Sequence, residues 1–358
     1  MADQVKVAVV RTAPHRVHED YGRVLDLSGC GELLSGASDV IVYGGLTWSH
    51  FMPGSSSPPW QLDGLAAAIQ PGNGWRWIAG TGHTARPVQG AREARWPAAL
   101  ERHGQRFEPI GRGQHVLSPP KGRHLMVLPR VLPEGIHVPS SYHGTVAVHL
   151  PTFKTHGNIG FAGAVENVWS SWMPTGGGRA AAVQHEVLVD LLTLQWNTHR
   201  SVCAVMDATI VGDGAGPRTV EPKEANALLA STDPVALDAV AASLAGFEPF
   251  AIRYLALAHA LGLGCANIEE IDVIGDGFEP GELRLHARRP PAALLRTVLS
   301  ELRLSRLEDW LFRRRWLVPA SALYYDVLWY YTVGRQRLAS FRGSAWGAVF
   351  ASYAQTPG

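Results

Sequence analysis

An apolar and glycine-rich segment, LPTFKTHGNIGFAGAVENVW at 150–169, contains four polar side chains of kinds that act in catalysis. They are Lys154, His156, Glu166 and Asn167. Lysine, histidine and glutamate can transfer protons near neutral pH when their surroundings shift their pKa values. The preceding stretch TVAVHL is typical of a strand that ends at Pro151, and ligands of open α/β sheets bind beyond the carboxyl ends of strands. The pattern therefore predicts a catalytic site that begins at Lys154 and His156.

Two further carboxylates are candidates for the same site. Asp207 closes the predicted strand SVCAVMDA and precedes the stretch GDGAGP, whose backbone N–H groups could hold an anion. Asp238 lies one turn inside DPVALDAVAASLAG, which is apolar on every face and so is predicted to be buried. A buried carboxylate needs a partner such as Lys154, a histidine or a metal. A purely structural role stays open for each: a turn at Asp207, and a tie to neighbouring backbone at Asp238.

Aromatic, amide and histidine side chains beyond predicted strands are candidates for binding a substrate. They are Trp48, His50, Trp60 and Gln61 in the segment 44–64, and His83 in TGHT. We expect the segment 44–64 to act as a lid over an apolar or aromatic ligand, although it equally suits a loop packed on its own domain. His185 shares a helix face with Leu188 and Leu192, where either a core histidine or a substrate contact fits.

Two alternating sets of elements must position these side chains. Short apolar runs with β-branched residues predict strands at 5–10, 39–45, 74–80, 124–129, 145–151, 201–208 and 269–277. Helical patterns lie at 62–69, 97–104, 179–196, 233–246 and 249–262. The alternation predicts an α/β fold with a largely parallel or mixed central sheet flanked by helices.

The chain divides by character near residue 291. Residues 1–291 are predicted to form the α/β domain, with an irregular insertion at about 105–145. Residues 292–358 are predicted to form a helical, aromatic C-terminal extension. We expect this extension to pack on the domain, or on a second copy in a homodimer, through Trp310, Trp316, Trp329 and Tyr330.

Composition narrows the class of protein. The 358 residues are 46% hydrophobic, and 32 Lys and Arg nearly balance 31 Asp and Glu, so no overall field favours nucleic acid. No window approaches the roughly 20 apolar residues of a membrane helix, and the first residues lack the features of a signal peptide. We therefore expect a cytoplasmic protein that binds a small-molecule substrate and neither membranes nor nucleic acid. The three cysteines form no C-x-x-C pair, so no iron–sulfur cluster is expected, while a divalent metal stays open.

Several motifs in their order resemble the family called domain of unknown function 362. They are LPTFKTHGNIGFAGAVENVW, VMDATIVGDGAGP, LLASTDPVALDAVAASLAG, LGLG-x4-IEEIDVIGDG and SAWGAVFASY, and they span most of residues 5–280 and the tail. The resemblance implies that Lys154, His156, Asn167, Asp207 and Asp238 converge. This chain departs from the family's pattern at Glu166, where Lys-Asn is typical, and in lacking the cysteine cluster of many members. Some members resemble tailoring enzymes of bacterial secondary metabolism.

Three classes of function fit these observations. The first is an enzyme that performs acid–base chemistry, metal-assisted or not, on a small organic or aromatic metabolite, and its reaction class is open among lyase, hydrolase, isomerase and bond-forming enzyme. The second is a ligand-binding or partner protein without catalysis. The third is an interaction protein whose basic segment 295–317 touches an anionic surface. The polar groups of 150–169 favour the enzyme.

Overall fold

The computed structural model describes residues 4–80, 86–110, 113, 115–174, 178–289 and 323–353. The strands are β1 Val5–Arg11, β2 Val40–Gly44, β3 Trp75–Ala79, β4 Phe107–Pro109, β5 His115–Val116, β6 His137–Val138, β7 Val146–Leu150, β8 Thr152–His156, β9 Gly160–Ala162, β10 Ser201–Ala215, β11 Thr219–Ser231 and β12 Ile271–Gly275. A mixed, largely parallel ten-stranded sheet has the order β12-β1-β11-β10-β7-β2-β3-β4, and β8 joins it by pairing with β10 and β9. The predicted α/β fold is confirmed.

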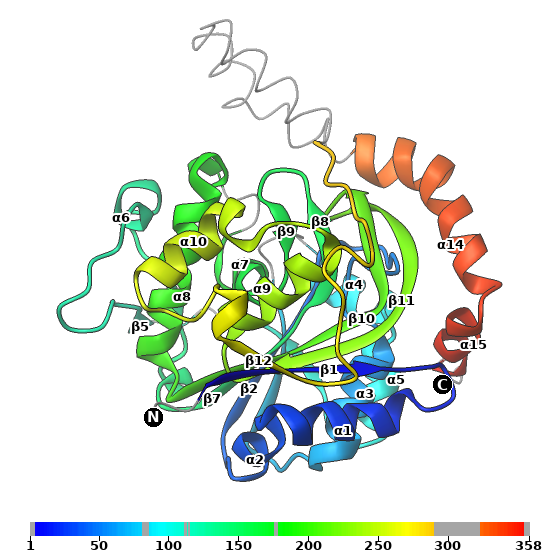
Figure 1. Cartoon of the computed structure of the whole chain (residues 1–358), viewed down its shortest axis with the longest axis horizontal. Helices are drawn as coiled ribbons and strands as arrows, with labels where there is room; N and C mark the ends of the chain where they lie inside the picture. The colour runs from blue at the N-terminus through cyan, green and yellow to red at the C-terminus, as the bar shows by residue number, and fades with distance from the viewer. Residues whose placement is uncertain are drawn as a thin grey trace, which may run out of the picture.

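Helices cover both faces of this sheet. The α-helices are α1 Val17–Ser28, α2 Cys30–Ser35, α3 Pro59–Ile69, α4 Pro87–Glu93, α5 Trp96–Glu101, α6 Leu128–Val131, α7 Ala164–Trp172, α8 Gln184–Thr198, α9 Pro234–Ala245, α10 Arg253–Ala260, α14 Arg335–Arg342 and α15 Ala345–Ser352. Short 3₁₀ turns are η1 Ser140–Tyr142, η2 Gly178–Val183, η3 Pro249–Ala251 and η4 Ile268–Glu270, and η5 Leu323–Gly334 is a π-helix. Figure 1 shows α1 and α3 on one face of the sheet and α7, α8, α9 and α10 on the other.

Successive side chains along each strand point to opposite faces of the sheet and pack into two separate hydrophobic cores. In β10, Val202, Ala204 and Met206 pack under α7, α8 and α9. Cys203 and Val205 point to the opposite face, toward α1 and α3. This period of two fixes which face each polar side chain of β10 can reach.

β10 and β11 extend past the sheet as a long antiparallel hairpin, which Figure 1 shows curving away from the other strands. The predicted strand 201–208 is therefore too short, because β10 runs on to Ala215. The stretch 212–217, whose N–H groups were candidates for holding an anion, lies in the same hairpin, where Gly212 and Gly214 pair with Pro222 and Val220. Most of the stretch is strand, and it forms no open loop.

The predicted strand 124–129 is also absent, because α6 begins at Leu128. The Asp190 carboxylate of α8 accepts the backbone N–H groups of Met126, Val127 and Leu128 at 2.7–2.9 Å. These donors are thereby satisfied without a neighbouring strand. The rest of the predicted insertion forms short elements, among them the two-stranded sheet of β5 and β6.

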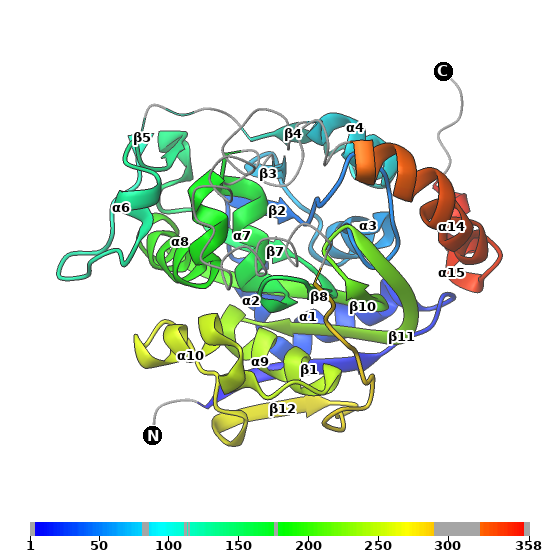
Figure 2. The ribbon, with the colours of Figure 1, turned by 90° about the horizontal axis from the view of Figure 1, so that it is seen from above.

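The C-terminal helices lie against the hairpin and the α3 side of the domain (Figure 2). Tyr330 stacks on His50 at a centroid distance of 4.0 Å, and Trp329 lies 5.9 Å from Trp48. The expected packing through Trp329 and Tyr330 is confirmed, whereas Trp310 and Trp316 lie outside the described residues. In the described part of the chain, no helix has the length and apolar character needed to cross a bilayer.

Candidate functional site

Asp238 joins two helices at the centre of the α7–α10 face. Its side chain projects from α9 and is fully buried. Oδ1 accepts the backbone N–H of Ala164 at 2.6 Å and Oδ2 that of Val165 at 3.0 Å, so the carboxylate caps the N-terminus of α7. Tyr254 of α10 donates its hydroxyl to Oδ2 at 3.2 Å. Burial nevertheless raises the pKa of Asp238 to about 7, and the charge of Glu166 adds to this rise.

Lys154 and Glu166 lie close enough to Asp238 for their charges to interact with its carboxylate. Both side chains are buried, at 3% and 2% exposure. Burial lowers the pKa of Lys154, and the negative charges of Glu166 and Asp238 oppose that change. The Lys154 ammonium donates to Thr152 Oγ1 at 2.9 Å, which holds its head group at the start of β8. A buried lysine whose charge interacts with two buried carboxylates is an arrangement in which protons can move at neutral pH.

Tyr254 and His185 complete this group. Burial, together with the charges of Asp238 and Glu166, holds the pKa of Tyr254 well above its usual value, so the phenol stays protonated and donates. The half-buried His185 ring stacks on Tyr254 at 6.1 Å between centroids. Its Nδ1 atom is buried and has no hydrogen-bond partner among the described residues. We call Lys154, Glu166, Asp238, Tyr254 and His185 the acid–base cluster.

His156 lies beyond Lys154 at the end of β8, where the chain turns into β9. Its Nδ1 accepts the backbone N–H of Asn158 at 3.1 Å. Asn158 in turn lies 3.4 Å from Gln184, the first residue of α8 and the neighbour of His185. This turn therefore connects the end of β8 to the start of the helix that carries His185.

Asp207 is directed to the opposite face of the sheet. Its Oδ2 accepts the Tyr21 hydroxyl at 2.8 Å and Trp60 Nε1 at 2.9 Å, while Oδ1 accepts the backbone N–H and hydroxyl of Thr209. Burial raises its pKa, which these donors oppose. Asp207 lies in the middle of β10, just before the register shift at Thr209, and it ties α1 and α3 to that strand. The structure does not bring Asp207 together with Asp238.

Asn167 belongs to a third buried network, which it shares with His149. Its amide nitrogen donates to the Tyr43 carbonyl at 2.8 Å and lies 3.2 Å from His149 Nδ1. Gln195 lies 2.7 Å from His149 Nε2. Burial lowers the pKa of His149 to about 3, so this imidazole is neutral. The network joins β2, β7, α7 and α8 and fixes the position of α7 behind Glu166.

The segment 44–64 does not form an open lid, because the C-terminal helices cover it. Trp48 is 2% exposed, and its Nε1 donates to Asp326 of η5. Trp60 is 1% exposed and packs 5.1 Å from Trp346 of α15. Gln61 donates to the Pro151 and Val205 carbonyls at 3.0 and 2.9 Å, which holds α3 against the break between β7 and β8. His83 lies outside the described residues.

The buried carboxylates of the structure are held by hydrogen-bond donors. Among the described residues, no group of three or more His, Cys, Asp and Glu side chains is placed to hold a metal ion. The carboxylates of Asp238 and Asp207 are instead occupied by N–H and O–H donors. The charge of Lys154 interacts with those of Asp238 and Glu166, and not with that of Asp207.

The family of the chain follows from its middle portion. A family model described as a domain of unknown function, DUF362, matches residues 56–243, which is more than half of the 358 residues. The chain belongs to the DUF362 family. The DUF362 match includes Lys154, Glu166, His185 and Asp238 and ends before Tyr254. No curated protein and no solved structure matches the chain. The family description therefore supplies no activity, and the chemistry must come from the residues themselves.

Sequence reasoning missed Tyr254 and indicated the close approach at Gly163. Tyr254 lies in an apolar helix whose pattern gives no sign that the hydroxyl meets Asp238. Gly163 is required because a Cβ there would lie 2.2 Å from Asp238 Oδ1. The glycine-rich character of 157–163 was the available signal, since glycine permits such close approach.

Proposed function

We propose that the chain is an enzyme that performs acid–base chemistry on a small organic molecule, with Lys154 and Glu166 as the groups that transfer protons. The observation that carries this proposal is the burial of an ammonium and two carboxylates that lie close enough for their charges to interact. Buried charges of this kind cost stability unless they are paired, and they are common where function requires them. Asp207 and Asn167 have structural networks that explain their burial.

The remaining members of the acid–base cluster have distinct roles in this proposal. Asp238 is a positioning residue, since it holds the N-terminus of α7 and with it Glu166. Tyr254 keeps that carboxylate in place from α10. His185 offers an unpaired buried nitrogen, which suits a hydrogen bond to a bound molecule. The stacked rings of His185 and Tyr254 favour a flat or aromatic substrate.

In this proposal the reaction is a tailoring step on a metabolite of bacterial secondary metabolism, carried out in the cytoplasm. The family resemblance of the sequence motifs supports that role, and the near balance of charge supports a partner that is neither nucleic acid nor membrane. A homodimer through the C-terminal extension is supported by apolar side chains of η5 at 47–56% exposure, Leu323, Val327, Leu328 and Tyr331.

The unpaired nitrogen of His185 also supports a second candidate, a protein that binds a ligand without converting it. Proton exchange distinguishes the two functions. A panel of small aromatic ketones and acids with acidic C–H bonds, incubated with the protein in D2O, should take up deuterium that mass spectrometry detects. Binding measured by thermal shift without deuterium uptake or product would favour the second candidate.

Matched variants assign the exchange to the cluster. Lys154→Met and Glu166→Gln keep the size of each side chain and remove its charge. Lys223→Met is the control, because Lys223 forms a half-exposed ion pair with Asp213 on the hairpin. We expect exchange to fall about 100-fold or more in the first two variants and to persist in the control.

A further inference from the structure

A cavity of about 750 Å³ lies at the other end of the sheet from the acid–base cluster. Gln4 and Lys6 at the start of β1 form one side of it, and the turn from β11 to α9 at Asp233 forms another. β1 runs parallel to β7 and β2, so this is the edge where the parallel strands begin. Lys154 follows the edge where they end. The cavity is therefore a separate place on the molecule, with a volume typical of small-molecule sites.

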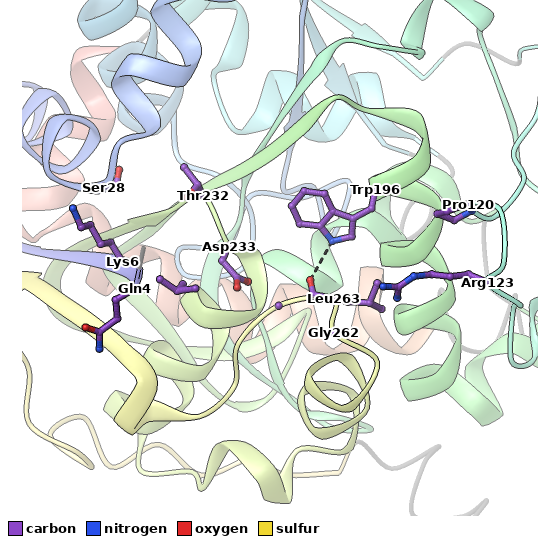
Figure 3. Close-up of a pocket in the computed structure, with 12 residues that line it drawn as sticks. Gln4, Lys6, Ser28, Pro120, Arg123, Trp196, Thr232, Asp233, Gly262 and Leu263 are labelled. Carbon is purple, nitrogen blue, oxygen red and sulfur yellow. Dashed lines mark hydrogen bonds between the residues drawn. The ribbon is translucent and has the colours of Figure 1, made fainter. Parts of the chain in front are cut away.

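The charged groups of this cavity favour an anion. Lys6 and Arg123 line it, and Figure 3 shows them on opposite sides of Trp196. No side-chain hydrogen bond or ion pair engages the Lys6 ammonium among the described residues. Arg123 uses Nη1 on the Leu261 carbonyl, which anchors its guanidinium at the rim and leaves its other N–H groups available.

The acidic side chain of the cavity is already occupied. Asp233 Oδ1 accepts the backbone N–H groups of Val235 and Ala236, and Oδ2 accepts that of Cys265 at 2.8 Å. These three bonds direct its charge to the N-terminus of α9 and the loop after α10. Among the described residues, no ion pair joins Asp233 to Lys6 or Arg123.

Trp196 supplies a flat apolar wall between the cations. Its Nε1 donates to the Leu263 carbonyl at 3.1 Å, which fixes the orientation of the ring (Figure 3). The half-buried ring lines the cavity beside Gly262 and Gly264, which have no side chains to fill it. A fixed indole face of this kind stacks on planar rings.

We propose that this cavity binds a small organic anion in which a planar ring carries a phosphate or carboxylate group, with Trp196 stacking on the ring and Lys6 or Arg123 holding the anion. This second site lies outside the proposed catalytic chemistry. The class of ligand follows from the unpaired ammonium, the anchored guanidinium and the fixed indole that share one cavity.

Isothermal titration calorimetry with defined probes tests the site. Adenosine 5′-monophosphate represents a ring with a phosphate, and indole-3-acetate represents a ring with a carboxylate. Adenosine, which has the ring without the phosphate, and inorganic phosphate, which has the anion without the ring, are the controls. We expect one or both of the complete probes to bind at least about tenfold more tightly than either half, and the better probe identifies the anionic group.

Variants place that binding in the cavity. Trp196→Leu should weaken binding of the better probe about tenfold or more. Of Lys6→Gln and Arg123→Gln, the variant that removes the cation holding the anion should weaken it several-fold, with a smaller salt dependence. Lys6 is exposed, so Lys6→Gln should fold like the parent even if Trp196→Leu lowers the free energy of unfolding. Lys121→Gln is the matched control, since Lys121 is exposed on the same loop as Arg123 and does not line the cavity. The proposal is overturned if neither probe binds below about 1 mM, or if Lys6→Gln and Arg123→Gln both bind the better probe like the parent.

Discussion

Gly163 leaves the space that Asp238 fills. A Cβ on Gly163 would lie 2.2 Å from Asp238 Oδ1 and 2.8 Å from its carboxyl carbon. The carboxylate can therefore cross from α9 to the first N–H groups of α7 only because residue 163 has no side chain. Glu166 lies in the first turn of the helix that this contact anchors.

Gly163→Ala should displace Asp238 from the N-terminus of α7. We expect the free energy of unfolding to fall by about 1–3 kcal/mol, because buried atoms have no room to move apart, and activity to fall with it. Chemical denaturation and the exchange assay measure the two effects. Gly22→Ala is the control: a Cβ on Gly22 of α1 meets nothing within 4 Å, so that variant should be as stable as the parent or slightly more stable. Equal effects in the two variants would contradict the close contact.

The Asp238 carboxyl should make stability depend on pH below neutrality. Its pKa rises from 3.8 in the unfolded chain to about 7 in the folded protein, so the folded state binds the additional proton between these values. The stabilisation is complete below about pH 4 and is lost as the pH rises through about 7, with an upper limit of about 4 kcal/mol.

Asp238→Asn removes this titration. We expect its free energy of unfolding to change less than that of the parent between pH 4 and 7, measured by denaturant titration at each pH. The variant should still lose about 1–3 kcal/mol at low pH, because an amide cannot accept both N–H groups of α7. Parallel profiles for parent and variant would show that Asp238 does not titrate in this range.

A second buried carboxylate, Asp63 of α3, fastens the C-terminal helix. Its Oδ2 accepts the Tyr353 hydroxyl at 2.6 Å and Arg102 at 2.8 Å, and His103 lies 2.6 Å from Oδ1. Burial opposes ionisation, but the hydrogen bonds from His18, Tyr353 and His103 outweigh it and hold the pKa of Asp63 well below its usual range. This stabilisation is present above the unfolded pKa of about 4 and is lost as the pH falls further.

Tyr353→Phe should loosen the C-terminal helix without unfolding the domain. Removing one charge-assisted hydrogen bond should cost about 1.5–3 kcal/mol. Limited proteolysis followed by mass spectrometry should show faster cleavage within 335–353 than in the parent. Tyr324→Phe is the control, because Tyr324 is 37% exposed on η5. Unchanged cleavage in Tyr353→Phe would mean that other contacts hold this helix.

Trp60 should contribute to stability rather than to ligand binding. Its buried ring projects from α3 and packs against Trp346 of α15, and its Nε1 donates to the buried Asp207 carboxylate. Trp60→Ala should therefore lower the free energy of unfolding by about 3–5 kcal/mol, as measured by denaturant titration. A variant as stable as the parent but with reduced ligand affinity would instead support the role of the segment 44–64 as a lid.

The sheet was predictable where strands are buried on both faces. Val5–Arg11, Val40–Gly44 and Val146–Leu150 are runs of apolar residues that the period and length identify as strands. β11 was missed because its first half lies in the hairpin beyond the sheet, where Glu221, Pro222 and Lys223 are partly or fully exposed. A tertiary contact explains why no strand forms at 124–129. The Asp190 carboxylate accepts the backbone N–H groups of residues 126–128, which a neighbouring strand would otherwise have to satisfy.

The candidate site was predictable in part, because charged residues within apolar segments are recognisable in the sequence. Lys154, Glu166 and Asp238 are charges in segments that are otherwise apolar, so their burial followed from the sequence. Asp207 has the same sequence pattern, but the alternation of β10 directs it to the other face, and the partners Tyr21 and Trp60 are distant in sequence. Sequence pattern therefore indicates that a carboxylate is buried, and only the fold shows which neighbours compensate it.

The exchange of substrate hydrogen for deuterium in Lys154→Met and Glu166→Gln tests the central claim most directly. Each variant is compared with the parent at equal fractions of folded protein, established by thermal melting, with Lys223→Met alongside. If the cluster transfers protons, the parent and Lys223→Met label a member of the panel, and both cluster variants lose at least about 100-fold of that rate while remaining folded. Labelling at the parental rate by folded Lys154→Met and Glu166→Gln, or no labelling by the parent, would contradict the proposed chemistry.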